Sequence, residues 1–322
     1  MVPTTQRVFP FFVGCGRSGT TLLRAMFDSH PEMSIPPETQ FILSMAIRRR
    51  RYERQDGIDI DPFLADVYRY TDLGERWRLG SEEVRDAWSS EPPRDYPDAI
   101  RALFTLQAHR GGKKRYGNKT PIHVLSLPPL SRLFPEARFV HVLRDGRDVA
   151  LSYLESDFGP DTVEGAALRW RHWTGRGVAA GRRLGPERYR EVRYEELVDE
   201  PERVARSICE FVMLDFDDAM LRYADRAEEI LSGVTFPHSH QGLRLRPTKG
   251  LRDWRSQMSA GDAVRFEALA GDLLSRLGYE RRAETFPRGM RLAALWRRSV
   301  SDVKQAAGAT RRRRGSTPAA GE

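Results

Sequence analysis

The chain has 322 residues and a formal net charge of +8, with 53 Lys and Arg against 45 Asp and Glu. This length suits one large α/β domain or two small ones, and a hydrophobic fraction of 40% excludes disorder of the whole chain. The basic excess points to an anionic partner, whether nucleic acid, a membrane surface or a phosphate-bearing cofactor. Two cysteines far apart in the chain, Cys15 and Cys209, argue against a disulfide framework and predict a reducing, cytoplasmic location.

The first predicted element is a strand buried on both faces. Residues 8–13 form a continuous apolar run, as expected for a strand in the interior of a parallel sheet. Pro10 lacks the N–H group that a ladder uses, so we expect strand pairing to begin just after it. A glycine-rich loop follows, and then an apolar face marks a helix that stops at His30-Pro31.

The glycine-rich loop at residues 14–21 is close to the phosphate-binding P-loop pattern: Gly14-Cys15-Gly16-Arg17-Ser18-Gly19-Thr20-Thr21. Its glycines let backbone N–H groups turn toward an anion, and the start of the helix adds partial positive charge. Thr20 stands where a nucleoside triphosphatase carries its lysine, and Arg17 lies inside the loop. We therefore expect a phosphate cradle for a ligand other than a nucleoside triphosphate with magnesium. The alternative is a glycine-rich turn with an ordinary helix cap.

Further strand and helix signals follow along the chain. A second strand-to-helix unit spans residues 138–155, and a third strand at residues 189–194 precedes a helix at residues 201–212. Residues 44–117 are charged and mixed, and predict helices packed beside the sheet. Strands separated by helices predict an α/β fold with a P-loop-type parallel sheet flanked by helices.

The C-terminal part differs in composition. A helix with Ser259 as its cap and Gly278 at its end belongs to the predicted domain at residues 1–287. Residues 288–322 carry nine basic residues against two acidic ones, which leaves +7 of the total +8 in this segment. We expect a basic amphipathic helix and a disordered tail there, with a weak contact to an anionic membrane surface or to nucleic acid. That contact would make the protein peripheral to the membrane.

Five motifs resemble those of sulfotransferases that use 3′-phosphoadenosine 5′-phosphosulfate (PAPS). The string from Val13 to Met26 resembles the family's 5′-phosphosulfate loop, and the string from Val142 to Ser152 resembles its 3′-phosphate site. Three shorter strings are similar to other family motifs: Asn118-Lys119-Thr120-Pro121, Val192-Arg193-Tyr194-Glu195-Glu196-Leu197 and Lys249-Gly250-Leu251-Arg252-Asp253-Trp254-Arg255. Because the five occur in family order, they imply the sulfotransferase fold and PAPS as the co-substrate.

The resemblance also implies roles for individual residues. Arg17 and Lys119 would neutralise the charge on the leaving oxygen, and Glu38 would take the proton of the acceptor hydroxyl as general base. Arg144 and Ser152 would clamp the 3′-phosphate. The full implied donor-binding set is Arg17, Ser18, Gly19, Thr20, Thr21, Arg144, Ser152, Tyr194 and Lys249, with Trp254 beside the adenosine. No metal is expected, because sulfate carries less charge than phosphate and fixed donors can stabilise it.

Among the branches of the family, the N-terminal run is most similar to tyrosylprotein sulfotransferases and related bacterial enzymes. In both, the loop arginine, here Arg17, is followed at the same spacing by a glutamate, here Glu38. Unlike that branch, the chain is expected to have no membrane anchor or secretory signal, and Gln40 and Ser156 stand where those enzymes carry arginines. The acceptor of the sulfuryl group therefore stays open among a protein tyrosine, a glycan, a lipid and a small molecule, and the oligomeric state is not indicated.

Each implied role has a structural alternative. Glu38 could cap a helix that starts near Thr39, and Lys119 could be a surface lysine after a turn. Plain structural roles are also open for Arg144 in an ion pair, Ser152 in a helix and Tyr194 in packing. Two other functions compete with sulfuryl transfer. One is a basic protein that binds nucleic acid or a membrane surface through its tail, and the other is a P-loop kinase, which the missing loop lysine disfavours.

Overall fold

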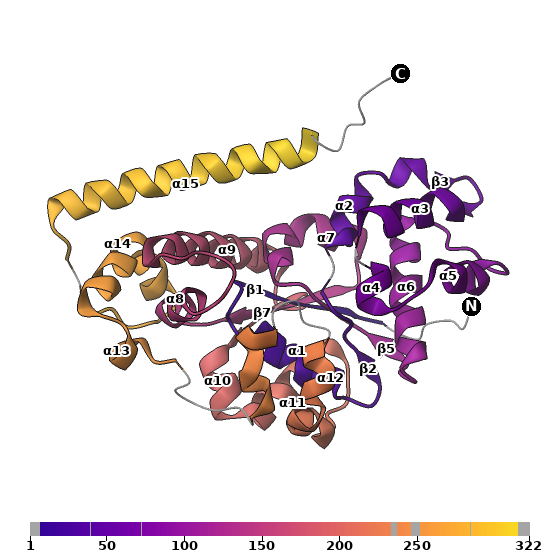
Figure 1. Cartoon of the computed structure of the whole chain (residues 1–322), viewed down its shortest axis with the longest axis horizontal. Helices are drawn as coiled ribbons and strands as arrows, with labels where there is room; N and C mark the ends of the chain where they lie inside the picture. Colours follow the sequence, from indigo (N-terminus) through magenta and orange to yellow (C-terminus); the bar gives the residue numbers. More distant parts are fainter. Residues whose placement is uncertain are drawn as a thin grey trace. The chain divides into compact units, whose positions relative to one another are not determined.

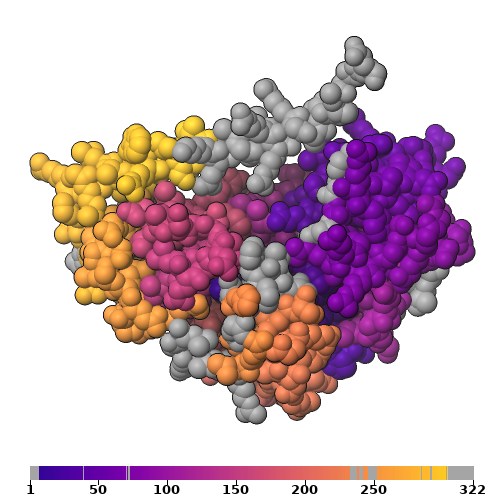
Figure 2. All heavy atoms as spheres, in the orientation of Figure 1, coloured from indigo at the N-terminus to yellow at the C-terminus, as the bar shows by residue number. Residues whose placement is uncertain are grey.

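The computed structural model of the chain (Figure 1) describes residues 7–38, 40–71, 73–232, 237–245, 252–283 and 285–314. Their internal contacts form two compact units. The first comprises the residues up to Arg144 together with Arg176–Lys249, and the second comprises Asp145–Gly175 together with the residues from Gly250 onward. Figure 2 shows one face of the same elements with all heavy atoms, coloured along the chain.

The first unit is built on a parallel sheet. Its strands in the described residues are β1 (Phe9–Gly14), β6 (Asn118–Lys119), β7 (Ala137–Leu143) and β8 (Tyr189–Arg193), in the order β6-β1-β7-β8. All three pairings are parallel. β1 and β7 are buried along nearly their whole length, which explains why their sequences are continuous apolar runs and not alternating ones. The predicted α/β fold with a parallel sheet flanked by helices is confirmed.

One face of this sheet is covered by helices that follow its strands. Figure 1 shows them on the same side of β1 and β7. They are α1 (Thr20–Asp28), α10 (Tyr194–Asp199), α11 (Pro201–Val212) and α12 (Ala227–Ser232), with the 3-10 helix η3 (Asp218–Arg226). The predicted helices near residues 20–30 and 201–212 are both confirmed. The predicted strand at residues 189–194 ends one residue early, because Tyr194 begins α10.

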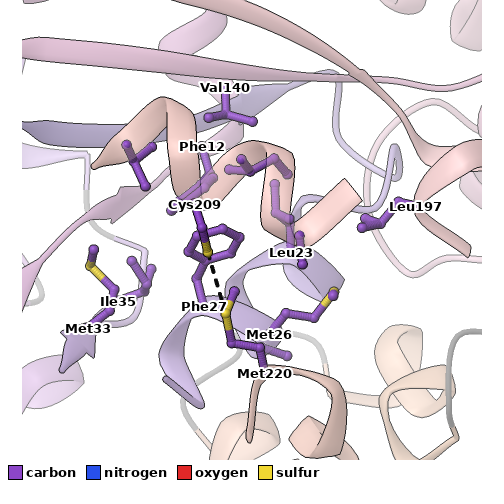
Figure 3. Close-up of a cluster of buried hydrophobic side chains, with 14 of the residues drawn as sticks. Phe12, Leu23, Met26, Phe27, Met33, Ile35, Val140, Leu197, Cys209 and Met220 are labelled. Atoms are coloured by element: carbon purple, nitrogen blue, oxygen red, sulfur yellow. Dashed lines mark hydrogen bonds between the residues drawn. The ribbon is translucent and has the colours of Figure 1, made fainter. Parts of the chain in front are cut away.

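The core on this face is shown in Figure 3. Phe12 of β1 packs on Phe27 of α1, with ring centroids 4.8 Å apart. Cys209 of α11 points its sulfur at that of Met220 in η3, at 3.7 Å. Cys15 and Cys209, the two cysteines of the chain, are both buried and are not joined by a disulfide.

The opposite face of the sheet is filled by aromatic rings. Phe9 and Phe11 of β1 both contact Phe134, which follows α7 (Leu127–Leu133), with ring centroids 5.2 and 5.9 Å away. Phe9 also meets Phe104 of α6 (Tyr96–Arg110) at 5.1 Å. Because side chains alternate along a strand, these odd positions face the rings while Phe12 faces α1.

Short helices make up most of the region between α1 and β6. They are α2 (Phe41–Ala46), η1 (Arg49–Arg51), α3 (Ile60–Tyr70), α4 (Leu73–Trp77), α5 (Ser81–Trp88) and α6. The sequence predicts these helices but not the two small strand pairs among them. These pairs are β2 (Met33–Ser34) with β5 (Arg115–Tyr116), and β3 (Glu53–Arg54) with β4 (Gly57–Ile58). Strands of two residues are too short to show an alternating pattern.

The described part of the second unit consists of helices and loops. Its helices are α8 (Gly146–Leu154), the first part of α9 (Val163–Leu184), α13 (Trp254–Gln257), α14 (Ala260–Arg276) and α15 (Arg288–Arg314). Ser259 Oγ accepts a hydrogen bond from the Asp262 backbone N–H at 3.0 Å, and Gly278 takes a φ of 77° after α14, so the predicted cap and stop are confirmed. Within the described residues, no helix has the length and apolarity needed to cross a membrane.

A buried arginine organises the second unit. Arg147 of α8 is fully buried and donates hydrogen bonds to Asp145 (3.0 and 2.7 Å) and to Glu267 of α14 (2.6 Å). The central carbon of its guanidinium lies 3.5 Å from the ring centroid of Trp254. Glu267, which is equally buried, also accepts hydrogen bonds from the backbone N–H groups of residues 282–283 at 2.9 Å. The network therefore ties α8, α13, α14 and the segment after α14 together.

Pro10 lies inside the ladder of β1, so the prediction that pairing begins after it is wrong. Pro10 pairs with Arg138 of β7, and the residue before it is already paired. In the described residues, β6 pairs with Phe11 and Phe12 alone. At Pro10, β1 is therefore paired on one side only among the described residues. The N–H group that proline lacks does not interrupt a second ladder there.

The basic C-terminal segment begins as a helix. α15 starts at Arg288, where the predicted basic segment starts, and the domain boundary at residue 287 stays a prediction. Residues 315–322, which are predicted to be disordered, lie outside the described residues.

Candidate active site

The predicted site residues of the first unit lie at the carboxyl ends of its strands. The glycine-rich loop follows β1, Lys119 ends β6, Arg144 follows β7 and Tyr194 follows β8. In a parallel sheet these ends share one edge. The chain leaves β1 for β6 on one side and later returns to β7 on the other, so strand order reverses at β1. Open α/β sheets bind ligands at this kind of switch point.

The loop after β1 has the backbone of an anion cradle. Arg17 and Gly19 take positive φ values of 69° and 96°, which turn successive N–H groups in one direction. Gly19 is the N-cap residue of α1, so the helix begins at Thr20 and points its N-terminus at the loop. The Ser18 hydroxyl is buried and has no hydrogen-bond partner among the described residues. A buried donor of this kind fits a site for phosphate or sulfate oxygens.

Tyr194 and Arg144 close one side of the loop. A Cβ atom on Gly19 would lie 2.3 Å from Cδ2 of Tyr194, so the ring rests directly on the glycine. The guanidinium carbon of Arg144 lies 4.3 Å from the centroid of the same ring, and Arg144 Nη1 donates a hydrogen bond to the Arg17 carbonyl at 3.2 Å. The structure thus brings Arg17, Gly19, Arg144 and Tyr194 together.

Lys119 joins the loop to the proposed base. Its side chain is 1% exposed, and its Nζ donates hydrogen bonds to the Glu38 carboxylate and to the Thr21 hydroxyl, the latter at 3.4 Å. Lys119 is therefore not a surface lysine. Burial lowers the pKa of Lys119, the Glu38 carboxylate opposes this, and the positive charge of Arg24 lowers it further.

Glu38 is not the cap of the helix that follows it. α2 begins at Phe41 with Gln40 as its N-cap residue, and this cap makes no side-chain hydrogen bond. The Glu38 side chain pairs instead with Lys119 and is 38% exposed. A carboxylate with one buried partner and an exposed face can reach an acceptor hydroxyl that enters from solvent.

Three predicted residues lie outside the described part of the first unit. Ser152 is a buried residue of α8 in the second unit. Trp254, in the same unit, packs on Arg147, and its backbone N–H donates to Asp148 at 2.9 Å. Its indole N–H is buried without a hydrogen-bond partner among the described residues, and its place beside the adenosine stays a prediction. Lys249 lies outside the described residues.

A basic cavity of about 620 Å³ opens beside Pro36 and Pro37, the residues just before Glu38. Arg24 and Arg76 both lower the pKa of Lys119 by their charge, which places them near the Glu38–Lys119 pair. The charged residues of the wall are Arg24, Arg76, Arg78, Arg110, Lys113 and Arg226 against Asp28, Glu75 and Glu229. No sequence motif indicates this cavity, because its residues come from separate segments of the chain. The position of Arg24 one turn after the loop is the one signal the sequence offers.

Comparisons with known proteins show the family of the chain. The sequence model of a family described as the sulfotransferase family matches residues 10–218. Protein-tyrosine sulfotransferase 2 of Gallus gallus is 27% identical over 285 residues, which cover 84% of this chain and 69% of that protein. The protein-tyrosine sulfotransferase of Drosophila melanogaster is 27% identical over 285 residues, which cover 84% of this chain and 51% of that protein.

Solved structures show the same fold. The sulfotransferase domain from the Synechococcus PCC 7002 olefin synthase superposes with a TM-score of 0.57 at 25% identity, covering 84% of this chain and 94% of that domain. The sulfotransferase domain from the curacin biosynthetic pathway has a TM-score of 0.56 at 19% identity, covering 85% and 98%. The chain therefore belongs to the sulfotransferase family and is an enzyme of sulfuryl transfer related to the protein-tyrosine sulfotransferases.

Proposed function

We propose that the chain transfers the sulfuryl group of PAPS to the hydroxyl group of an acceptor. The observation that carries this proposal is the buried Ser18 hydroxyl, which has no partner among the described residues and lies in a loop aimed at by a helix N-terminus. Arg144 and Tyr194 beside the same loop supply a cation and an aromatic ring, as a nucleotide with an extra phosphate requires. The roles of Ser152 and Lys249 rest on the resemblance to the family.

The described residues supply what the transfer step requires. In this step a bond forms between the acceptor oxygen and sulfur, and the bond from sulfur to the bridging oxygen of the 5′-phosphate breaks. Glu38 would accept the proton of the acceptor hydroxyl, while Arg17 and Lys119 would neutralise the charge on the bridging oxygen. Lys119 touches both Glu38 and Thr21 of the loop, which supports acceptor and donor chemistry at adjacent positions. We propose that these fixed charges make the reaction independent of a metal ion.

Adenosine 3′,5′-bisphosphate is expected to bind in the presence of EDTA and to raise the melting temperature. A ligand that binds only the folded state, at a concentration of 100 times its Kd, raises the free energy of unfolding by about 2.7 kcal/mol. The Gly19→Ala variant is expected to lose this stabilisation, because its methyl group would occupy the Tyr194 ring. Calorimetric melting with and without the nucleotide measures both effects.

Gly185→Ala is the matched control for backbone strain. Gly185 has a φ of 79° and no atom within 4 Å of an added Cβ, so alanine there has a similar backbone cost without the clash. The Gly185→Ala variant should have a lower melting temperature than the wild-type chain, and adenosine 3′,5′-bisphosphate should still raise that temperature. If the wild-type chain gives no response, PAPS is not the donor, and a full response in Gly19→Ala would move the donor site away from the loop.

We further propose that the basic cavity receives the acceptor and favours one with negative charge near its hydroxyl. A tyrosine flanked by acidic residues is such an acceptor, and protein tyrosine is the acceptor that the relatives' names state. The cavity wall carries more positive than negative side chains and adjoins the residues before Glu38. This contrasts with the nearly neutral charge balance of residues 1–287, so the excess is local.

The Arg76→Gln variant is expected to raise the KM for an acidic tyrosine peptide by roughly fivefold, equivalent to about 1 kcal/mol for one partly exposed charge. For a peptide with Asn and Gln in place of the acidic residues, the KM of the Arg76→Gln variant should stay close to that of the wild-type chain. Arg132→Gln, an exposed arginine of α7 outside the cavity, serves as the control. Equal changes in KM for the two peptides would show that the cavity does not distinguish acceptors by their charge.

The family match favours sulfuryl transfer over a P-loop kinase. Binding of the basic tail to a polyanion is compatible with catalysis and concerns a different part of the chain. The cytoplasmic location stays a prediction.

A further inference from the structure

α15 is attached to the second unit along one of its sides. Ala294 is 5% exposed, and Arg298 Nη2 donates a hydrogen bond to the Ala268 carbonyl of α14 at 2.9 Å. Arg298 also pairs with Asp272 at 3.2 Å, and Arg297 pairs with Glu164 at 3.5 Å. The acidic partners of the helix thus belong to the side that faces its own unit.

The opposite side of α15 carries large apolar side chains in solvent. Leu292, Leu295, Trp296 and Val303 are 68%, 56%, 67% and 68% exposed. At about 100° per residue these four fall within an arc of roughly 100°, so they form one stripe. Ala294, the buried residue, lies on the far side of the same helix. The first turns of α15 are yellow in Figures 1 and 2.

Basic residues accompany this stripe. The segment from residue 288 to residue 322 holds +7 of the total charge of +8, and Arg288 at the start of the helix is exposed. A helix with an apolar stripe, a tryptophan in that stripe and a basic flank suits the boundary between anionic headgroups and acyl chains. We propose that α15 docks on the surface of an anionic phospholipid bilayer, with the stripe of Leu292, Leu295, Trp296 and Val303 inserted.

Two other occupants fit the stripe less well. Nucleic acid would engage the arginines through phosphate contacts, and four exposed apolar side chains add nothing to that binding. A second copy of α15 would cover the stripe but would bring two segments of +7 together, and like charges oppose such pairing. An anionic bilayer satisfies the apolar stripe and the basic flank at once.

The full chain is expected to cosediment with vesicles of phosphatidylcholine mixed with phosphatidylserine, and not with vesicles of phosphatidylcholine alone. The triple variant Leu292→Ser, Leu295→Ser, Trp296→Ser is expected to bind the mixed vesicles at least about tenfold more weakly, because each serine removes apolar surface that the bilayer would bury. Its transfer activity and melting temperature should stay as in the wild type, since these side chains are exposed.

The matched control carries the same kind of change elsewhere. Ile47, Leu154 and Met213 are 56%, 41% and 44% exposed on other elements, and their replacement by serine should leave vesicle binding intact. A duplex DNA oligonucleotide and gel filtration complete the experiment. The proposal is overturned if the wild-type chain does not bind the mixed vesicles, or if the α15 variant binds them like the wild type. Three other results would also overturn it. Vesicle binding could fall equally in both triple variants, or the α15 variant could keep strong binding to the DNA duplex. The wild-type chain could also be a dimer in gel filtration that the α15 variant does not form.

Discussion

The Glu38→Gln variant is expected to turn over about 10²–10⁴-fold more slowly than the wild-type chain, the usual contribution of a positioned general base. Glutamine keeps the size of the side chain and an oxygen that can accept from Lys119, but it cannot take the proton of the acceptor hydroxyl. Nucleotide binding should change little, because the loop backbone and Arg144 are untouched. The melting temperature should fall, because the buried Lys119 loses the negative charge beside it. Single-turnover transfer to an acceptor peptide, followed by mass, measures the loss.

Glu75→Gln is the control for this experiment. Glu75 is an exposed acidic residue of the cavity wall, so its replacement removes one carboxylate near the acceptor without touching Lys119. Its turnover is expected to stay within a small factor of wild type. If Glu38→Gln and Glu75→Gln behave alike, the proton goes to another group and Glu38 serves only to hold Lys119 in place.

The Arg147→Met variant is expected to lose about 3–5 kcal/mol of folding stability, the usual cost of breaking a buried ion pair. Methionine fills similar volume and keeps a flexible apolar stem on Trp254, but it leaves the buried Glu267 carboxylate without the positive charge beside it. Denaturant unfolding of the full chain, monitored by circular dichroism, gives the difference.

Arg171→Met separates this effect from the loss of any arginine. Arg171 pairs with Asp272 in the same unit, but both side chains are partly exposed, and such pairs contribute at most about 1 kcal/mol. The double variant Arg147→Met, Glu267→Met should recover part of the loss, since it removes both buried charges. An Arg147→Met loss no larger than that of Arg171→Met would contradict the role given to the network.

Sequence patterns predict the parts of this fold that are local. The strand predicted at residues 8–13, the loop after it and α1 follow each other directly, so apolar runs, the loop glycines and the stop at His30-Pro31 indicate them. Lys119 has no such local signal, because β6 is only two residues long, and only the resemblance of Asn118-Lys119-Thr120-Pro121 to a family motif indicates it. Its partner Glu38 lies 81 residues away, and no periodicity predicts a pair of that separation.

Two structural features escape sequence analysis altogether. The basic cavity collects residues from four separate segments, represented by Arg24, Arg76, Arg110 and Arg226. The Arg147–Glu267 pair joins residues 120 positions apart. Both consist of charged side chains whose role depends on tertiary neighbours, and in the sequence such residues resemble an ordinary solvated surface.

The strand order has a consequence for how the enzyme matures. β1, which leads into the donor loop, is among the first parts of the chain to be synthesised, yet Arg144 joins this loop from 127 residues downstream and Tyr194 only after β8. Parallel pairing over such distances loses chain entropy in closing long loops before the strand contacts form to offset that loss. Folding of this kind is therefore slow. A nascent chain that has not yet released β8 from the ribosome holds a glycine-rich loop with no ring over it. The aromatic ring that rests on Gly19 is thus supplied only after β8 has been synthesised.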